Sequence, residues 1–369
     1  QVTPGDDVEA STYGNNSFII SNTGDDDILN IKINTASGYM MDVVFDPVGT
    51  AGDSVAKCLT SGDAGNSASA VGLTVPGNGG SDSADCISIF EQPHNGVNNA
   101  EGFDVLNLSF TDFNPGESYS FGVDMDPTTI KGDLSSGDAG SISGFELIGA
   151  TISIEFASGV VYTTSLYDEG SLGGSKAIVN SVSNSLVAPS ILIDGSATSR
   201  VATQASQVVQ VTGEPNAMVS LLRVDGRLHI DAGNPSIGYD IDLFEANEAM
   251  VKELYTAQLD ASGIANIPVV LTETSGATAT PNGGLNHFIA VVTGDGNTNS
   301  IASNTIVLDY DPTAALSNLT VSYTLQGRTD YSIDLTVGIY EVGSAIPLLE
   351  FTPSGDVNGE AQLMGIPLG

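Results

Sequence analysis

Residues 103–128 read FDVLNLSFTDFNPGESYSFGVDMDPT, and this stretch decides the fold class. Val105–Phe110 and Ser118–Asp124 are short runs rich in apolar, β-branched and aromatic residues, which is typical of β-strands. Between them, Asn114-Pro115-Gly116 is a turn signal. Two such runs joined by a short connection predict a pair of antiparallel strands.

The same pattern continues on both sides of this stretch. Short runs of Val, Ile, Phe, Tyr and Thr are separated at regular intervals by clusters of Gly, Asp, Asn and Ser, as in antiparallel β-sandwiches. The other strands predicted before residue 188 are Ser17–Ile20, Ile28–Ile33, Met40–Phe45, Ile87–Phe90, Gly149–Phe156 and Val160–Ser165. Together they are enough for a jelly roll or a similar two-sheet domain. The predicted fold class is all-β, with sandwich domains in tandem.

The charge of the chain excludes two classes of partner. Its 369 residues include 45 Asp and Glu against 9 Lys and Arg, so the formal net charge is −36. Nucleic acids and anionic membrane surfaces are bound by clustered Lys and Arg, which this chain lacks. A hydrophobic content of 41% is too high for a disordered acidic tail. No apolar run is long enough to cross a bilayer, so we expect no membrane insertion.

The length and the turn-rich segments divide the chain into three blocks. The first block, residues 1–188, is jelly-roll-like and ends before Pro189. The second, residues 189–312, is Ig-like, and its predicted strands are Gln207–Val211, Met218–Val224, Ile264–Leu271, His287–Thr293 and Thr305–Tyr310. Within it, we expect Leu243–Leu259 to be a short helix or a long loop. The third, residues 313–369, is short for a sandwich, with predicted strands at Leu319–Leu325, Ser332–Tyr340 and Pro347–Phe351.

Three stretches resemble modules of secreted bacterial multidomain proteins. Residues 103–128 resemble the jelly-roll modules found beside malectin-like and polycystic-kidney-disease-type repeats. Val211–Val219 resembles the start of a bacterial Ig-like domain, with Ser303–Leu308 as its closing strand. Gly355–Gly369 resembles the prealbumin-like, carboxypeptidase-regulatory-like repeats of surface and dockerin-bearing proteins. The resemblance implies secretion and a modular organisation, and it implies no reaction.

The resemblance also implies a site of assembly at the end of the third block. In prealbumin-like domains a Gly-x-Pro-x-Gly turn precedes one more strand, whereas this sequence ends at Gly365-Ile366-Pro367-Leu368-Gly369. A sheet without its last strand exposes unpaired backbone groups that recruit a strand from another chain. We therefore expect a neighbouring copy, or a cleaved remainder of the protein, to fill the vacant position and build a head-to-tail polymer. The alternative is a chain that continues beyond Gly369.

Several features indicate an extracellular or cell-surface location. Gln1 is not a translational start, so we expect a processed, secreted chain. Cys58 and Cys86 enclose a segment rich in Gly, Ser, Asp and Asn, which predicts a disulfide, although two buried thiols are the alternative. Because 36 excess negative charges repel one another, we expect a saline or calcium-rich setting.

Calcium is the predicted cofactor, because it binds clustered carboxylate and carbonyl oxygens on loops. The two candidate clusters are Asp25, Asp26 and Asp27, and Asp124, Asp126 and Asp133. In so acidic a chain, a solvated surface is the alternative for each of them.

No motif for catalysis stands out, so we predict that the protein is not an enzyme. His94, His229 and His287 lack partners at the spacing of metal ligands. No Ser, Cys or Thr lies in a nucleophile motif, and with 45 acidic residues any pair of carboxylates could be proposed. The predicted function is therefore structural or adhesive: a subunit of an extracellular filament, sheath or surface layer.

The alternative function is a set of carbohydrate-binding modules from a protein that handles polysaccharides. Sugar rings stack on aromatic side chains, and Trp, the best platform, is absent. The remaining candidates, for which core packing is the commoner role, are Tyr13, Tyr39, Phe113, Tyr119, Tyr162 and Tyr167.

Overall fold

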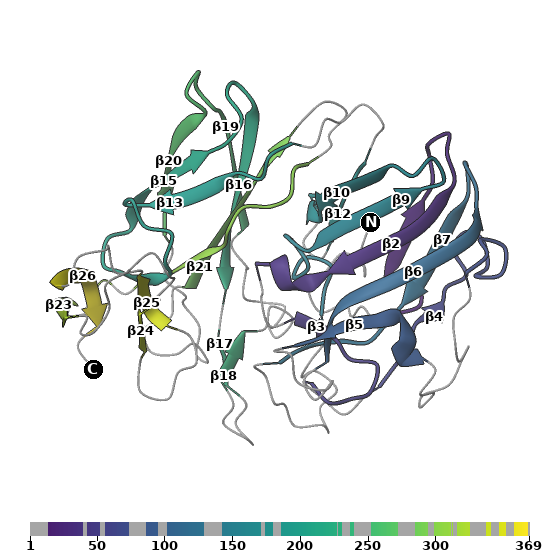
Figure 1. The fold of residues 1–369 in the computed structure, drawn as a ribbon, viewed down its shortest axis with the longest axis horizontal. Coiled ribbons are helices and arrows are strands. Elements are labelled where there is room, and N and C mark those ends of the chain that lie inside the picture. Colours follow the sequence, from purple (N-terminus) through teal and green to yellow (C-terminus); the bar gives the residue numbers. More distant parts are fainter. Residues whose placement is uncertain are drawn as a thin grey trace.

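A computed structural model of the chain shows an all-β protein built from several mostly antiparallel sheets (Figure 1). The structure describes residues 14–39, 43–51, 56–73, 86–94, 102–128, 142–170, 174–179, 186–226, 228–230, 237–239, 252–271, 285–293, 299–310, 312, 316–324, 337–340, 347–351 and 358–367. The predicted all-β sandwich class is confirmed.

Two sheets make up most of the first block. The large one has the strand order β10 (Val161–Ser165), β9 (Thr151–Phe156), β2 (Ile28–Asn34), β6 (Phe103–Phe113), β3 (Val43–Phe45) and β8 (Met125–Pro127), and β5 (Phe90–Pro93) also pairs with β6. The small one has the order β1 (Phe18–Ser21), β7 (Ser118–Gly122) and β4 (Thr60–Ser61), and a short pair, β11 (Tyr167–Asp168) and β12 (Ser175–Lys176), follows. β6, which belongs to residues 103–128, lies inside the large sheet, between β2 and β3.

Alternation along the strands builds the core between these sheets. Ile31 and Ile33 of β2 are buried, as are Leu106 and Leu108 of β6. Aromatic rings link the two sheets, because Phe110 of β6 contacts Tyr119 of β7 edge to face, with ring centroids 6.4 Å apart. The alternating polar residues of β2 and β6 are left on the outer face of the large sheet.

The second block is a sandwich of a three-stranded and a five-stranded sheet. The first has the order β13 (Ser190–Ile193), β15 (Ser206–Thr212) and β20 (Ile264–Val270). The second has the order β14 (Arg200–Ala202), β22 (Ile306–Tyr310), β21 (Leu285–Thr293), β16 (Met218–Gly226) and β19 (Lys252–Gln258). β14 and β22 run parallel, and the other pairs are antiparallel. A separate pair is formed by β17 (Leu228–Ile230) and β18 (Ile237–Tyr239).

Strands β16 and β21 of the five-stranded sheet are buried on both faces. Val219 and Leu221 of β16 point into the sandwich of the second block. Leu222 and Val224 of the same strand belong instead to the core of the first block, together with Ile289 and Val291 of β21. The hydrophobic core therefore continues across the boundary predicted near residue 188.

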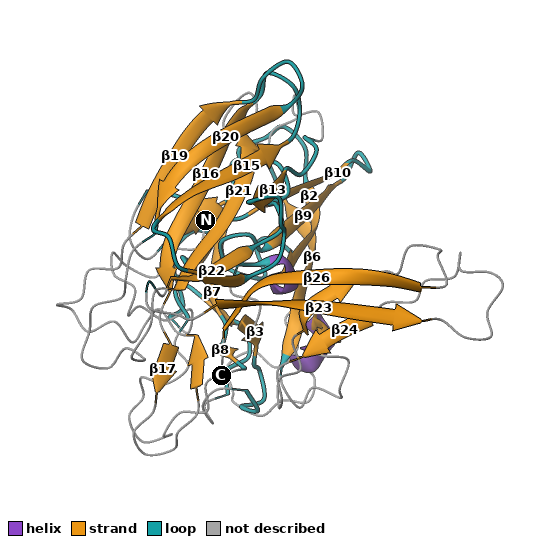
Figure 2. Ribbon diagram, turned by 90° about the vertical axis from the view of Figure 1, so that its left-hand side faces the viewer, coloured by secondary structure: helices purple, strands orange, loops and turns teal. Residues whose placement is uncertain are grey.

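The third block contains two pairs of strands among its described residues. β23 (Leu316–Thr324) pairs with β26 (Asn358–Pro367), and β24 (Val337–Tyr340) pairs with β25 (Pro347–Phe351). We call β23 and β26 the C-terminal ribbon, and Figure 2 shows them running side by side as a long ribbon. β26 also contacts β14 of the second block.

Three local expectations are wrong. A strand was expected at Ile87–Phe90, but Ile87–Ile89 belong to the 3-10 helix Cys86–Ile89, and only Phe90 lies in a strand, β5. Lys252–Gln258, within the stretch expected to be a helix or loop, is the edge strand β19. Gly365, Ile366 and Pro367 were expected in a terminal turn, but they belong to β26, where Pro367 pairs with Leu316 and Ile366 with Ser317. Leu368 and Gly369 lie outside the described residues.

Candidate functional site

Polar side chains form rows across the outer face of the large sheet. In one row, Thr163 of β10 pairs with Ser153 of β9, Ser153 with Lys32 of β2, and Lys32 with Asn107 of β6. In the next row, Asn30 pairs with both Glu155 and Ser109. Because side chains two residues apart on a strand share a face, the rows form one continuous polar surface.

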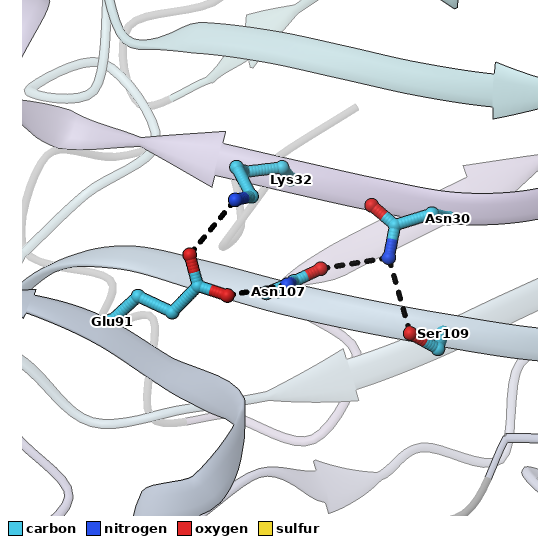
Figure 3. A network of polar contacts seen from close by, with 5 residues as sticks. All are labelled: Asn30, Lys32, Glu91, Asn107 and Ser109. Atoms are coloured by element: carbon cyan, nitrogen blue, oxygen red, sulfur yellow. Dashed lines mark hydrogen bonds and ion pairs between the residues drawn. The ribbon is translucent and has the colours of Figure 1, made fainter.

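Five side chains of this surface form a hydrogen-bonded network, which we call the sheet-face network (Figure 3). Lys32 Nζ donates to Glu91 Oε2 at 2.8 Å, and Asn107 Nδ2 donates to Glu91 Oε1 at 2.6 Å. Asn30 Nδ2 donates to Asn107 Oδ1 at 2.7 Å and to Ser109 Oγ at 3.1 Å. The network thus joins three strands, β2, β5 and β6, that are held side by side in one sheet.

Hydrogen bonds from neighbouring side chains stabilise the negative charge of Glu91. The hydrogen bond from Lys32, followed by that from Asn107, holds the pKa of Glu91 below its usual value. The side chains of Lys32 and Glu91 are 39% and 38% exposed, so water screens the pair and its contribution to stability is small.

The arrangement supports two kinds of chemistry. Amide, hydroxyl, ammonium and carboxylate groups on one face of the sheet can form hydrogen bonds with a hydroxyl-rich ligand. In addition, the Glu91 carboxylate contacts an amine through one oxygen and an amide nitrogen through the other. A carboxylate in this position can carry protons between the two nitrogens.

The structure gives Asp26 a structural role and does not show its cluster as a metal site. Asp26 Oδ1 accepts from the backbone N–H of Asp27 at 3.0 Å, and Oδ2 accepts from that of Ser158 at 3.1 Å. The hydrogen bonds from Ser158 hold the pKa of Asp26 below its usual value. Asp25 is exposed and Asp27 half-buried, so Asp26 ties the loop after β1 to the turn between β9 and β10.

Asp124 and Asp126 lie in the interior of the first block. They are 5% and 1% exposed and flank Met125 at the start of β8, beside the fully buried Asp46. Asp46 accepts from the backbone N–H groups of Val48, Thr50 and Ala51, and its burial raises its pKa. Asp133, the third predicted ligand, lies outside the described residues. Within the described ranges, no three His, Cys, Asp or Glu side chains are grouped to hold a metal ion.

The predicted Cys58–Cys86 bridge stays a prediction. Cys58 is 7% exposed, and the part of the chain that the structure describes contains no free cysteine thiol. The side chain of Cys86 lies outside the described residues.

Most of the aromatic residues considered for sugar stacking are core residues, which agrees with the expectation that core packing is their commoner role. Tyr39, Phe113, Tyr119 and Tyr167 are at most 4% exposed. Tyr162 is half-buried against Phe156, and Tyr13 lies outside the described residues. None of these buried rings can stack on a sugar at the surface.

The sheet-face network was not predicted, although part of its signal is visible in the sequence. Asn30 and Lys32 alternate with the core residues Ile31 and Ile33, which predicts that they point outward. The pairing of β2 with β6, and of β6 with β5, joins distant segments and cannot be read from the sequence.

Comparison with known proteins does not assign the chain to a family. No protein-family model matches it, and no curated protein is similar enough to match. Among the described residues, no helix is long and apolar enough to cross a membrane.

Proposed function

We propose that this protein is a structural or adhesive building unit of an extracellular filament, sheath or surface layer. The observation that carries the proposal is the hydrophobic core that passes without a break from the first block into the second. We call this contact between the two blocks, made by Leu222, Val224, Ile289 and Val291, the joint. Such a joint suits a protein that transmits load, because two domains that share a core cannot hinge freely.

Polar contacts reinforce this joint. Tyr167 Oη donates to the carbonyl of Ser220 at 3.1 Å, and the backbone N–H of Ala302 donates to Ser165 Oγ at 2.8 Å. Thr164 Oγ1 donates to the carbonyl of Asn299 at 2.6 Å. The joint thus combines apolar burial with directional hydrogen bonds that fix the orientation of the blocks.

We further propose that assembly uses the C-terminal ribbon, in a way that differs from the one first expected. Ile366 and Pro367 pair with Ser317 and Leu316 of β23, so the proposed assembly does not depend on a turn at these residues. A two-stranded ribbon is only marginally stable in water, and among the described residues neither strand has a second strand partner. A strand from a neighbouring copy would extend the ribbon and stabilise both molecules.

Electron microscopy of the purified protein in saline buffer tests the assembly. We expect ordered filaments or layers from the unchanged chain and none from Val321→Pro, which removes a backbone donor from β23. Val270→Thr, on the exposed outer face of β20, is the control and should assemble normally. A monodisperse monomer at every protein concentration tested would overturn the proposal.

Polysaccharide binding is the second candidate, and the polar rows of the large sheet favour it. The buried aromatic rings count against it, because they leave hydrogen bonding as the main source of affinity. We expect Asn30→Ala to reduce retention on a neutral polysaccharide matrix, whereas Gln210→Ala, on the outer side of β15, should not. Equal retention of both variants would exclude the sheet-face network as the binding surface.

Secretion and calcium binding remain part of the proposal. The net charge of −36 predicts that salt or calcium stabilises the fold by screening or binding. We expect the melting temperature to rise when NaCl or CaCl2 is added, and a larger effect of CaCl2 at equal ionic strength would indicate bound ions. A melting temperature that neither salt changes would contradict both expectations.

A further inference from the structure

We propose that Lys32 and Asn107 become joined by a cross-strand amide bond in the folded protein, with Glu91 as the proton carrier and Asn30 as the oxyanion donor. This would be a self-catalysed covalent modification of the sheet. The inference does not rest on the proposed function, since the bond can be detected whether or not the protein assembles.

The register of the sheet places the two reacting side chains opposite each other. Lys32 of β2 and Asn107 of β6 are direct cross-strand partners in an antiparallel pair. Side chains in such positions start about 5 Å apart at their Cβ atoms, which is well within the reach of a lysine. Both strands lie inside the large sheet, so their backbones are held by neighbours on both sides.

Glu91 contacts both nitrogen atoms that exchange protons. Its Oε2 accepts from Lys32 Nζ, the nucleophile, and its Oε1 accepts from Asn107 Nδ2, the leaving group. Asn30 Nδ2 lies 2.7 Å from Asn107 Oδ1, the oxygen on which negative charge develops during attack. Nucleophile, general base and acid, leaving group and oxyanion donor are thus all present in one network (Figure 3).

The step balances without a cofactor or an oxidant. Glu91 takes a proton from the Lys32 ammonium, and the freed Nζ lone pair attacks Asn107 Cγ to form a new C–N bond. Glu91 then gives its proton to Nδ2 as the old C–N bond breaks. The second proton lost by Nζ leaves with the ammonia, so the products are a secondary amide and one ammonium ion, and Glu91 is again a carboxylate.

The reaction is slow because an ammonium group has no lone pair for attack, and the loss of ammonia makes it irreversible, so the product accumulates. Lys32 must therefore pass a proton to Glu91, with which it forms an ion pair, before it can react. Against this, well-oriented groups in one molecule react as if present at about 10⁵ to 10⁸ M. Because the ammonium ion diffuses away, the bond persists once formed, and we expect the crosslinked fraction to grow with the age of the sample.

Mass spectrometry of the full-length protein tests the proposal. After incubation, we expect the intact mass to fall by the mass of one ammonia molecule, and a proteolytic digest to contain a branched peptide that joins Lys32 to Asn107. The digest decides the assignment, because cyclisation of an amino-terminal glutamine removes the same mass. A digest with only linear peptides for both residues would overturn the proposal.

Three variants separate this reaction from other losses of ammonia. Lys32→Arg and Glu91→Gln should each abolish the branched peptide, the second without removing either reacting group. Lys57→Arg is the matched control: Lys57 Nζ also donates to an asparagine, Asn15 Oδ1, at 2.9 Å, but it lies outside the sheet-face network, so the branched peptide should persist. A branched peptide that persists in Glu91→Gln would overturn the role given to that carboxylate.

Discussion

His287 is a buried titratable group at the joint between the first and second blocks. It is 3% exposed, its ring lies edge to face with that of Tyr39 at 5.7 Å, and burial lowers its pKa from 6.5 to about 4. Because the unfolded chain then binds more protons between about pH 6.5 and pH 4, stability should fall as the pH drops through this range. The full effect is roughly 3 kcal/mol.

Denaturant unfolding at pH 7 and pH 4.5 measures this loss. The carboxylates of the chain also titrate near the lower value, so His287→Leu is the comparison that isolates the imidazole. We expect the variant to lose less stability on acidification than the unchanged protein. The same loss in both proteins would show that His287 does not contribute.

Gly149 is required at the same joint for two reasons that a pair of variants can separate. Its φ is +92°, and an added Cβ would lie 2.6 Å from Ile289 Cδ1. Gly159 has a similar φ of +82°, with nothing within 4 Å of its added Cβ. We expect Gly159→Ala to cost about 1 kcal/mol for its backbone conformation and Gly149→Ala about 1 to 3 kcal/mol more. Equal losses in denaturant unfolding would argue against close packing at Gly149.

For the residues of the sheet-face network, the direction of a side chain can be predicted from the sequence, but its partners cannot. The outward direction of Asn30 and Lys32 follows from alternation with buried isoleucines. Their partners do not follow from it, since Lys32 and Glu91 are 59 residues apart and Asn30 and Asn107 are 77 apart. The acidic clusters gave a clear signal in composition, but hydrogen bonds to the backbone, which the sequence does not reveal, occupy Asp26.

Among the strands, the edge strand β19 is held in register by a buried cation. Arg223 of β16 is fully buried and pairs directly with Glu253 of β19, with Nε 3.2 Å from Glu253 Oε2. Arg223 Nη1 also donates to Asn286 Oδ1 at 2.6 Å. Glu253→Gln would weaken a charged hydrogen bond to a guanidinium inside the sandwich, and we expect a loss of about 1 to 2 kcal/mol because Glu253 is 43% exposed.

The same substitution on another strand is the control for this prediction. Glu155→Gln, on the exposed face of β9, should change the free energy of unfolding by less than about 0.5 kcal/mol. If both variants lose the same stability in urea, the Arg223–Glu253 pair does not fix β19.

Strands with clean alternation were predictable, and those defined by long-range contacts were not. β20 carries buried residues at alternate positions, as β6 does from Leu106 to Phe110, and the existence of both strands follows from the sequence. In β19, half-buried and exposed residues alternate, but the apolar Leu254 is on the exposed side and is 50% exposed, so the sequence does not show which face is buried. The turn expected at Gly365–Pro367 came from a family resemblance, and pairing with β23 decides the actual structure.

The largest consequence for the whole molecule is that the first and second blocks should unfold together. Each block has its own sandwich core, but β16 and β21 contribute side chains to both cores. Unfolding of the second block would remove the contacts that Leu222, Val224, Ile289 and Val291 make with the core of the first block. An apolar surface shared in this way couples the stability of two sandwiches that the sequence presents as separate modules.

Val269→Ala tests this coupling because Val269 lies in the three-stranded sheet, whereas β16 and β21 belong to the five-stranded sheet. Val269 is 2% exposed and belongs to the core of the second block. We expect the substitution to cost about 1 to 3 kcal/mol. If the blocks unfold as one unit, the slowest-exchanging backbone amides of β2 and β6 in the first block should lose protection by the same free energy as those of β15 and β20. Unchanged protection of β2 and β6 in native-state hydrogen exchange would mean that the shared core does not couple the blocks, and the argument for a rigid load-bearing unit would fail with it.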